Sequence, residues 1–332
     1  MDFRLELNIK PFKKKIHWAD KIFLIGSCFT EHISKKLSQN KFTVCENPHG
    51  ILFNPISIET ALKTYVSNKK YTETDLFLYN ELFGTWDHHG QFSQPKAANA
   101  LEVMNNNVSD ANVFIQQSSW IIITLGSAWV YETTEQAPLQ TGLVAANCHK
   151  MPAQYFNHRL LSLAEVNQSL TNIVEIIHAA NQHAQVIFTI SPVRHHREGL
   201  VENNRSKALL ISAVHEITGK YPQTIYFPAY ELVIDDLRDY RFFAEDMVHP
   251  NYQATQYVWE KFVDACIDAD AQKGMLQVSK ITGAKNHKPL HPQTKQHQDF
   301  LKKMLAETKA LQLQYPFINL EEEMAYFEKN QM

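Results

Sequence analysis

"KIFLIGSCFTEHISKKL" (residues 21–37) contains a short apolar run that ends at Gly26 and is followed by a charged segment with helical spacing. A near-continuous apolar run of this length is typical of a strand buried on both faces of a parallel sheet. Ser27 and Cys28, which both carry nucleophilic side chains, stand where the helix begins. The segment therefore predicts a strand, a turn and a helix, with a reactive group at the turn.

Four more apolar runs of the same kind follow along the chain. They are "FTVC" (42–45), "SWIIITLG" (119–126), "AQVIFTIS" (184–191) and "TIYFPA" (224–229). Helical patterns separate them, and the clearest begins at the capping box formed by Ser162 and Glu165. This alternation predicts a three-layer α/β/α fold with a mainly parallel sheet and right-handed crossovers.

The chain divides into two parts in this interpretation. Residues 1–270 form the α/β domain, with an insertion at about 55–110 that holds a helix and a possible hairpin in "FLYNELFGTWDHHGQFS" (77–93). Residues 271–332 form a polar linker and a helical extension, with helices near 296–315 and 321–328. An apolar stripe on the first of these helices favours packing within the chain, although a homodimer stays open alongside a monomer. The stripe consists of Leu301, Met304, Leu305 and Leu311.

The charge, the N-terminal residues and the cysteines indicate which partners and which cellular compartment to expect. The 332 residues carry 32 basic and 35 acidic side chains, a net charge of −3 with no basic patch, so neither nucleic acid nor a membrane surface is an expected partner. The N-terminal residues lack the apolar core of a secretory signal, which favours a cytoplasmic protein. The four cysteines are widely spaced and are expected to be free thiols.

A carboxylate and an imidazole lie close together near the other end of the predicted sheet. Asp246 precedes His249 by three residues in "FFAEDMVHPNYQAT" (242–255), just before a helical segment. This spacing allows the carboxylate to orient Nδ1–H of the imidazole while Nε2 faces a nucleophile from another strand end. A capping Asp and a packed His are the structural alternative, but Ser27 after the first strand favours the catalytic one.

The order Ser, Asp, His resembles the SGNH (GDSL-type) hydrolase superfamily, and "GSCF" (26–29) resembles the motif of its GSCFA branch. The likeness extends over about residues 20–265, through "NPHGILFNPISI" (47–58), "ITLGSAWVYE" (123–132), "NCHKMP" (147–152), "SPVRHHREGLVENNRSKALL" (191–210) and "LRDYRFFAEDMVHP" (237–250). It implies a flavodoxin-like α/β/α SGNH hydrolase fold and a serine esterase without a cofactor. Ser27 would be the nucleophile, His249 the general base and Asp246 its orienting group, while Cys28 would point into the helix–sheet packing.

The resemblance also implies an oxyanion hole. Its donors would be the amide of Ser27, the amide of Gly50 and an Asn side chain, but Ala128 stands where that Asn is expected. Ser127 and Asn147 are the candidates to replace it. Losing one donor costs about 10²–10³ in rate, so a missing replacement predicts slow turnover.

The expected substrate is a small-molecule or saccharide ester carrying a small acyl group, for example acetyl on a carbohydrate. The residues expected to contact it are Lys150, Arg194, His195 and Trp129. Three alternatives remain: an acyltransferase on the same triad, a non-catalytic saccharide-binding module with a degenerate oxyanion hole, and a metal-dependent hydrolase. The last would use "DHHG" (87–90) and "RHHRE" (194–198), but adjacent histidines on a strand face opposite ways, so no metal is expected.

Overall fold

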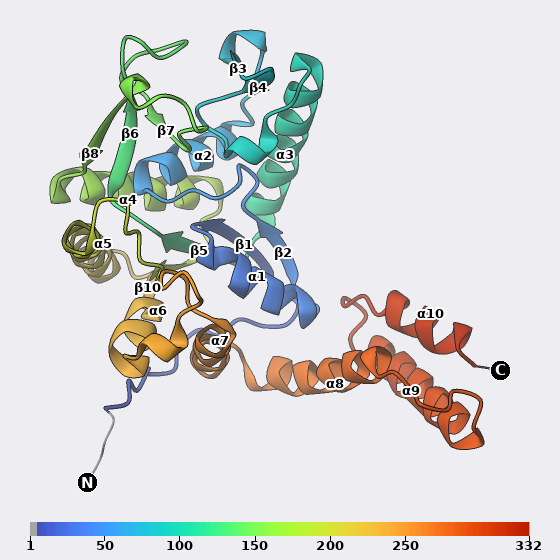
Figure 1. Ribbon diagram of the computed structural model, residues 1–332. Helices are drawn as coiled ribbons and strands as arrows, with labels where there is room; N and C mark the ends of the chain where they lie inside the picture. Colours follow the sequence, from blue (N-terminus) through green and yellow to red (C-terminus); the bar gives the residue numbers. More distant parts are fainter. Residues whose placement is uncertain (1–4, 332) are drawn as a thin grey trace. The chain divides into compact units, whose positions relative to one another are not determined.

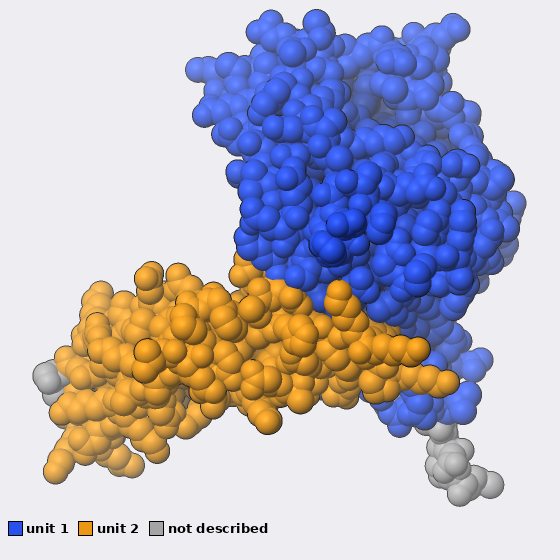
Figure 2. Space-filling model, turned by 180° about the vertical axis from the view of Figure 1, so that it is seen from behind, with its two compact units in different colours: residues 1–9, 21–34, 44–261 blue, residues 10–20, 35–43, 262–332 orange. Residues whose placement is uncertain are grey.

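The computed structural model describes residues 5–331, which divide into two compact units. Unit 1 comprises the residues up to 9, 21–34 and 44–261, and unit 2 comprises 10–20, 35–43 and the residues from 262 onward, as coloured in Figure 2. Unit 2 therefore draws on two N-terminal segments as well as on the C-terminal part of the chain. No helix in the described range is both long and apolar enough to span a bilayer.

Five strands form the main sheet of unit 1 in the order β10–β9–β5–β1–β2 (Figure 1). The pairs β1–β5, β5–β9 and β9–β10 are parallel. Because β2 lies on one side of β1 and β5 on the other, the strand order reverses between β1 and β5, which is where parallel sheets bind ligands. All five strands expected from the sequence are present: β1 (Lys21–Gly26), β2 (Thr43–Glu46), β5 (Trp120–Leu125), β9 (Gln185–Ile190) and β10 (Thr224–Phe227).

Helices cover both faces of this sheet (Figure 1), which confirms the three-layer α/β/α fold. One face packs on α2 (Pro55–Ser67), α3 (Ala97–Gln117), α4 (Leu163–Ala180) and α5 (Leu200–Lys220). Their apolar stripes enclose alternate strand residues such as Phe23, Ile123 and Phe188. In Figure 1, α1 (Phe29–Gln39), α6 (Ala229–Glu231) and the start of α7 (Tyr252–Cys266) lie on the other face.

The segment expected as an insertion is largely part of the core. Its two helices, α2 and α3, connect β2 to β5, and Leu62, Met104 and Val108 belong to the main apolar cluster. The expected hairpin is present as β3 (Phe77–Tyr79) and β4 (Leu82–Gly84). The sequence interpretation missed a second, antiparallel sheet of order β7–β6–β8, built from β6 (Trp129–Thr133), β7 (Val144–Ala145) and β8 (Phe156–Leu160).

The residues after 271 form a helix rather than a polar linker. Asp268 caps α8 (Ala269–Asn286) by accepting a hydrogen bond from the amide of Ala271. The two helices expected further on are present as α9 (Lys295–Gln314) and α10 (Glu321–Lys329). Three of the four residues of the predicted stripe on α9 are buried, which supports packing within the chain: Leu301, Met304 and Leu311.

Candidate active site

The turn after β1 is held tightly against β5. Gly26 has a φ of +141°, and a Cβ at this position would lie 2.1 Å from the carbonyl oxygen of Thr124, so only glycine fits here. The Gly26 amide donates to Oδ1 of Asn47 (2.8 Å), and the amide of Ser27 donates to the Thr124 carbonyl (3.0 Å). The conformation of the next two residues is therefore fixed by the sheet itself.

Ser27 lies at the predicted turn, but its side chain is fully buried. A Cβ added at Gly126 would lie 3.0 Å from the Ser27 Cβ and 3.1 Å from the Phe53 ring, so the loop after β5 packs closely against Ser27. Among the described residues its Oγ has no hydrogen-bond partner, and Ser27 is not part of the pocket wall described below.

Cys28 lines the pocket, contrary to the expectation that it packs between helix and sheet. Burial, and next the nearby carboxylate of Glu31, raise the pKa of its thiol, so the thiol is protonated at rest. Lys207 lowers this pKa, as do the backbone amides of Cys28 and Phe29 at the start of α1. Their effect is smaller than that of burial and Glu31, so the pKa stays above its usual value.

Asp246 and His249 form the expected pair. Oδ2 of Asp246 lies 2.6 Å from Nδ1 of His249, and Oδ1 accepts the amides of Val248 (2.9 Å) and His249 (3.0 Å). These hydrogen bonds, first that from the His249 amide and then that from its ring, hold the pKa of the Asp246 carboxyl far below its usual range. An ionised carboxylate can only accept a hydrogen bond, so Nδ1 of His249 carries the ring hydrogen and donates it to Asp246, which leaves Nε2 as the ring nitrogen able to take a proton.

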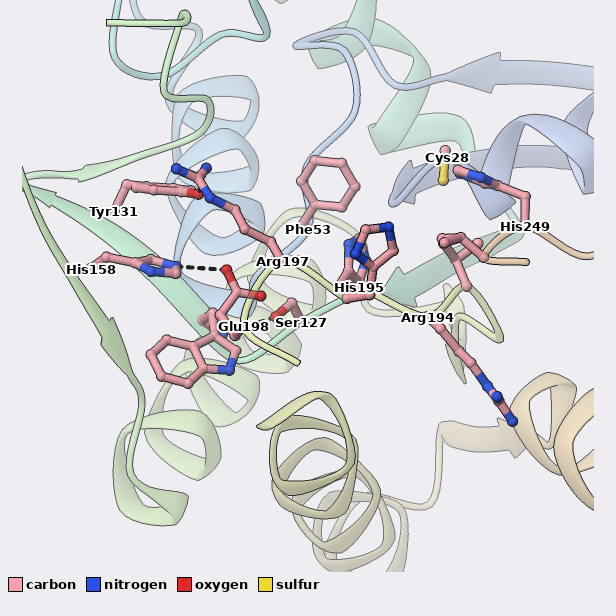
Figure 3. A pocket seen from close by; sticks show the side chains of 14 residues that line it. Cys28, Phe53, Ser127, Tyr131, His158, Arg194, His195, Arg197, Glu198 and His249 are labelled. Atoms are coloured by element: carbon pink, nitrogen blue, oxygen red, sulfur yellow. Dashed lines mark hydrogen bonds and ion pairs between the residues drawn. The ribbon is translucent and has the colours of Figure 1, made fainter. Parts of the chain in front are cut away.

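His249 and Cys28 line the same cavity, of about 440 Å³, and Figure 3 draws both at one end of it. The cavity extends outward from the carboxyl ends of β1 and β5 to the small sheet. Its lining residues come from six segments of unit 1: Cys28, Phe53, Ser127, Trp129, Tyr131, His158, Val193, Arg194, His195, His196, Arg197, Glu198, Val248 and His249.

The small sheet gives the cavity an aromatic wall. The rings of Tyr131 and His158 stack with centroids 4.4 Å apart, and the Trp129 ring lies 4.9 Å from that of His158. Arg197 donates to the Tyr131 hydroxyl, and Oε1 of Glu198 lies 3.5 Å from Nε2 of His158, the dashed contact in Figure 3. The wall therefore combines flat apolar faces with a cation and an anion.

A buried lysine and a neutral histidine lie at or next to the wall of the cavity. Nζ of Lys207 donates to the carbonyl oxygens of Gly126 (2.6 Å) and Ser191 (2.7 Å), and burial lowers the pKa of Lys207 to about 7. Burial, followed by Lys207 and His249, lowers the pKa of His195 to about 3. The imidazole of His195 is therefore neutral at physiological pH, and its Nε2 has no hydrogen-bond partner among the described residues.

The residues predicted for the oxyanion hole are not all brought together. The amide of Ser27 donates its hydrogen bond to the carbonyl of Thr124, and the amide of Gly50 donates to the carbonyl of Asn47 (2.7 Å). Asn147 accepts the His149 amide at Oδ1 (2.8 Å) and lies outside the lining of the cavity. Ser127 does line it, with its Oγ 3.2 Å from Oγ of Ser206.

Three of the four residues predicted to contact substrate line the cavity, namely Arg194, His195 and Trp129. Lys150 does not; it is exposed on a loop with a φ of +56°. Sequence reasoning assigned no wall role to His158, because β8 was not recognised as a strand. Nor did it single out Lys207, which resembles any other helical lysine until its burial is known.

The "DHHG" segment contributes to a buried cluster rather than to the cavity. The rings of His49 and His88 stack at 3.8 Å, and the Tyr71 hydroxyl connects Nε2 of His49 (3.2 Å) with Asp87 (2.8 Å). Within residues 5–331, no three His, Cys, Asp or Glu side chains are grouped in a way that could hold a metal ion. Burial lowers the pKa of His88 to about 3, so its ring is packed in the neutral form.

Comparison with known proteins gives a family. Residues 21–262 match the model described as the GSCFA family, and residues 278–330 match the one described as the GSCFA domain protein, C-terminal domain. No curated protein matches.

Similar solved structures include a mutant of Axe2, an acetyl-xylooligosaccharide esterase from Geobacillus Stearmophilus, with 10% identity, a TM-score of 0.39 and coverage of 76% of this chain and 95% of that one. Another is a carbohydrate esterase family 3 protein from Talaromyces cellulolyticus, with 10% identity, a TM-score of 0.33 and coverage of 79% and 99%. These likenesses are too distant to bear on activity. The first family model includes the turn after β1 and the Asp246–His249 pair, and the chain belongs to the GSCFA family.

Proposed function

We propose that this protein is an ester hydrolase of SGNH type that forms a covalent acyl-enzyme in the cavity. The observation that carries the proposal is the 2.6 Å contact between Asp246 and His249 at a cavity that the turn after β1 also lines. An oriented imidazole beside a nucleophile-bearing turn is the arrangement that acyl transfer requires. Ser27 and Cys28 are the two candidates for the nucleophile.

His249 acts first as general base and then as general acid. Nε2 takes the proton of the nucleophile while the ester carbonyl is attacked, and returns it to the leaving alcohol. Asp246 keeps Nδ1–H in place and stabilises the imidazolium that forms. In the second step water is the nucleophile: His249 takes its proton while it attacks the acyl-enzyme, and the carboxylic acid is released.

The oxyanion needs hydrogen-bond donors, and three groups near the cavity can supply them. They are the amides at the start of α1, the hydroxyl of Ser127 and the neutral ring of His195. A neutral imidazole has one ring N–H, which can donate a hydrogen bond to an oxyanion.

The wall favours a saccharide ester as substrate. The flat faces of Trp129, Tyr131 and His158 suit the apolar face of a sugar ring, and Arg197 and Glu198 offer partners to its hydroxyls. A small acyl group, such as acetyl, is the simplest one to place near His249. This extends the proposal to removal of small acyl groups from carbohydrates.

A saccharide-binding module without activity is the second candidate. One observation favours it. The amides of Ser27 and Gly50 already donate hydrogen bonds to carbonyl oxygens of the protein, so neither amide is available to an oxyanion. The binding module predicts saturable sugar binding with no ester turnover in the wild type.

Turnover of p-nitrophenyl acetate and of acetylated xylose by the full chain separates the two candidates. The hydrolase predicts turnover that falls by about 10²–10⁴ in His249→Ala, the range expected for a lost general base. His183→Ala, an exposed histidine outside the cavity, is the matched control and should retain wild-type rates. Equal rates in wild type and His249→Ala would contradict the proposal. Adding an acceptor sugar to the same assay tests whether acyl transfer outcompetes hydrolysis.

A further inference from the structure

We propose that Cys28, and not Ser27, is the nucleophile, so that the site is a Cys28–His249–Asp246 triad that works through a thioester. This inference rests on the proposed function, since it names the group that carries the acyl chain. It makes this member of the family a thiol-dependent enzyme.

The orientation of the turn separates the two candidates. Both residues follow Gly26, yet Cys28 lines the cavity that His249 lines, and Ser27 does not. The Ser27 side chain is fully buried, and its Cβ lies 3.0 Å from where a Cβ on Gly126 would stand. Figure 3 shows the Cys28 sulfur at the same end of the cavity as the His249 ring.

Moving Ser27 into the cavity would disrupt the sheet. Its amide is hydrogen-bonded to the carbonyl of Thr124 on β5, and the preceding Gly26 pairs with Thr124 in the β1–β5 register. Rotating the turn by one residue would break these contacts and the Gly26–Asn47 hydrogen bond. Each broken buried hydrogen bond costs about 1–3 kcal/mol. The conformation that exposes Cys28 is thus the one the sheet enforces.

The surroundings of the thiol suit a nucleophile that is activated by a base during the reaction. Because burial and Glu31 keep the thiol protonated, it needs a proton acceptor, and His249 is oriented for that role. The amides of Cys28 and Phe29 and the ammonium group of Lys207 favour the charged sulfur once the proton leaves.

The other three cysteines lie outside the cavity lining. Burial raises the pKa of Cys45 to about 12 and places that of Cys266 well above its usual range. Cys148 is half-buried in the loop before His149. Cys45 and Cys148 are both free and partly exposed, which makes them internal references for the reactivity of Cys28.

The steps balance without any further reactant. The Cys28 S–H bond breaks as its proton moves to Nε2 of His249, and sulfur forms a bond to the ester carbonyl carbon. The C–O bond to the alcohol then breaks, and the alcohol leaves with the proton from His249. Water attacks the thioester carbon and gives its proton to His249, after which the C–S bond breaks, the carboxylic acid leaves and sulfur regains the proton.

The test is residue-resolved labelling of the full chain in two parallel reactions. In the first, iodoacetamide alkylation of each cysteine is followed over time in wild type, His249→Ala and Ser27→Ala. In the second, p-nitrophenyl acetate is acid-quenched and the acetylated peptide is mapped, with and without neutral hydroxylamine, which cleaves thioesters much faster than oxygen esters. Cys28→Ser and Cys28→Ala complete the set, and Cys28→Ser keeps the shape of the buried turn.

The expected result is alkylation of Cys28 that slows about 10-fold or more in His249→Ala, while Cys45 and Cys148 react at unchanged rates. The acetyl group should map to Cys28, be removed by hydroxylamine, persist in Ser27→Ala and be absent from Cys28→Ala. A hydroxylamine-resistant acetyl group that persists in Cys28→Ala would overturn the inference and leave the esterase proposal intact. Absence of ester turnover together with His249-dependent alkylation would support the thiol–imidazole pair and reject ester hydrolysis. Alkylation of Cys28 at equal rates with and without His249 would overturn the inference.

Discussion

Nζ of Lys207 lies 2.6 Å from the carbonyl oxygen of Gly126, so a buried lysine on α5 holds the loop that packs against Ser27. A second hydrogen bond, of 2.7 Å, reaches the carbonyl of Ser191 after β9. One side chain thereby ties together the carboxyl ends of two neighbouring strands beneath the cavity.

Replacing Lys207 by Met should destabilise the protein strongly. The change leaves the buried carbonyls of Gly126 and Ser191 without a donor, and the expected loss is about 2–4 kcal/mol in the free energy of unfolding. Urea unfolding measures it. Lys220→Met, at the exposed end of the same helix, should change stability by less than about 0.5 kcal/mol. Equal stability of Lys207→Met and wild type would show that water or a neighbouring donor replaces the ammonium group.

Acid should destabilise the fold through its buried histidines. Burial lowers the pKa of His88 and His195 to about 3 and that of His149 to about 4, whereas an unfolded histidine titrates near 6.5. Below about pH 6.5 the unfolded chain binds protons that the folded chain does not, so the stability present at neutral pH is lost as the pH falls towards 3–4.

The His88→Asn variant isolates one contribution to this acid sensitivity. Each such histidine adds about 1.4 kcal/mol of lost stability per pH unit within that window. The drop between pH 6.5 and pH 4.5 should therefore be about 2–3 kcal/mol smaller in His88→Asn than in wild type, by urea unfolding at both pH values. His183→Asn is the exposed control and should show the wild-type drop. An identical drop in all three proteins would mean that the buried ring takes up a proton without unfolding.

Removing the Trp129 ring should weaken substrate binding more than the chemical steps. The ring lies 4.9 Å from that of His158 in the aromatic wall of the cavity. Trp129→Ala is expected to raise KM for an acetylated sugar by about 10-fold, equivalent to one lost aromatic contact, with kcat changed far less. Trp129→Phe should recover most of the loss. A fall in kcat at unchanged KM would place Trp129 in the chemistry instead.

Two glycines of α8 give a matched pair within unit 2. A Cβ at Gly274 would lie 1.9 Å from the ring of Trp18, whereas a Cβ at Gly283 meets nothing within 4 Å. Gly274→Ala should cost about 1–3 kcal/mol through overpacking, and Gly283→Ala should stabilise the helix by about 0.5–1 kcal/mol. Thermal unfolding of both variants tests the sign. A stable Gly274→Ala protein would show that Trp18 repacks freely.

The main sheet could be predicted from the sequence because its strands are buried on both faces and so are apolar throughout. The small sheet could not, since β6 and β8 mix half-buried and polar residues and resemble loops. The helix α8 was missed for a related reason: its surface is mostly polar. Asp268 at its start was the signal that could have revealed it.

The Asp246–His249 pair could be predicted because three residues of separation leave little freedom in a turn. The choice between Ser27 and Cys28 could not be made in that way. It depends on how the chain leaves β1, and that is set by the φ of Gly26 and by the hydrogen bond from Ser27 to Thr124, on a strand almost a hundred residues further on. A one-residue rotation of this turn would exchange the buried and the accessible nucleophile.

The turn after β1 and the aromatic wall belong to two different sheets of unit 1. The turn after β1 and the strands that hold it belong to the main sheet, whereas the aromatic wall is carried by β6 and β8 of the separate sheet β7–β6–β8. Substitutions in those short strands alter what the cavity accepts without moving Cys28 or His249. The lining of the cavity and the geometry of the turn after β1 are therefore open to change independently of each other.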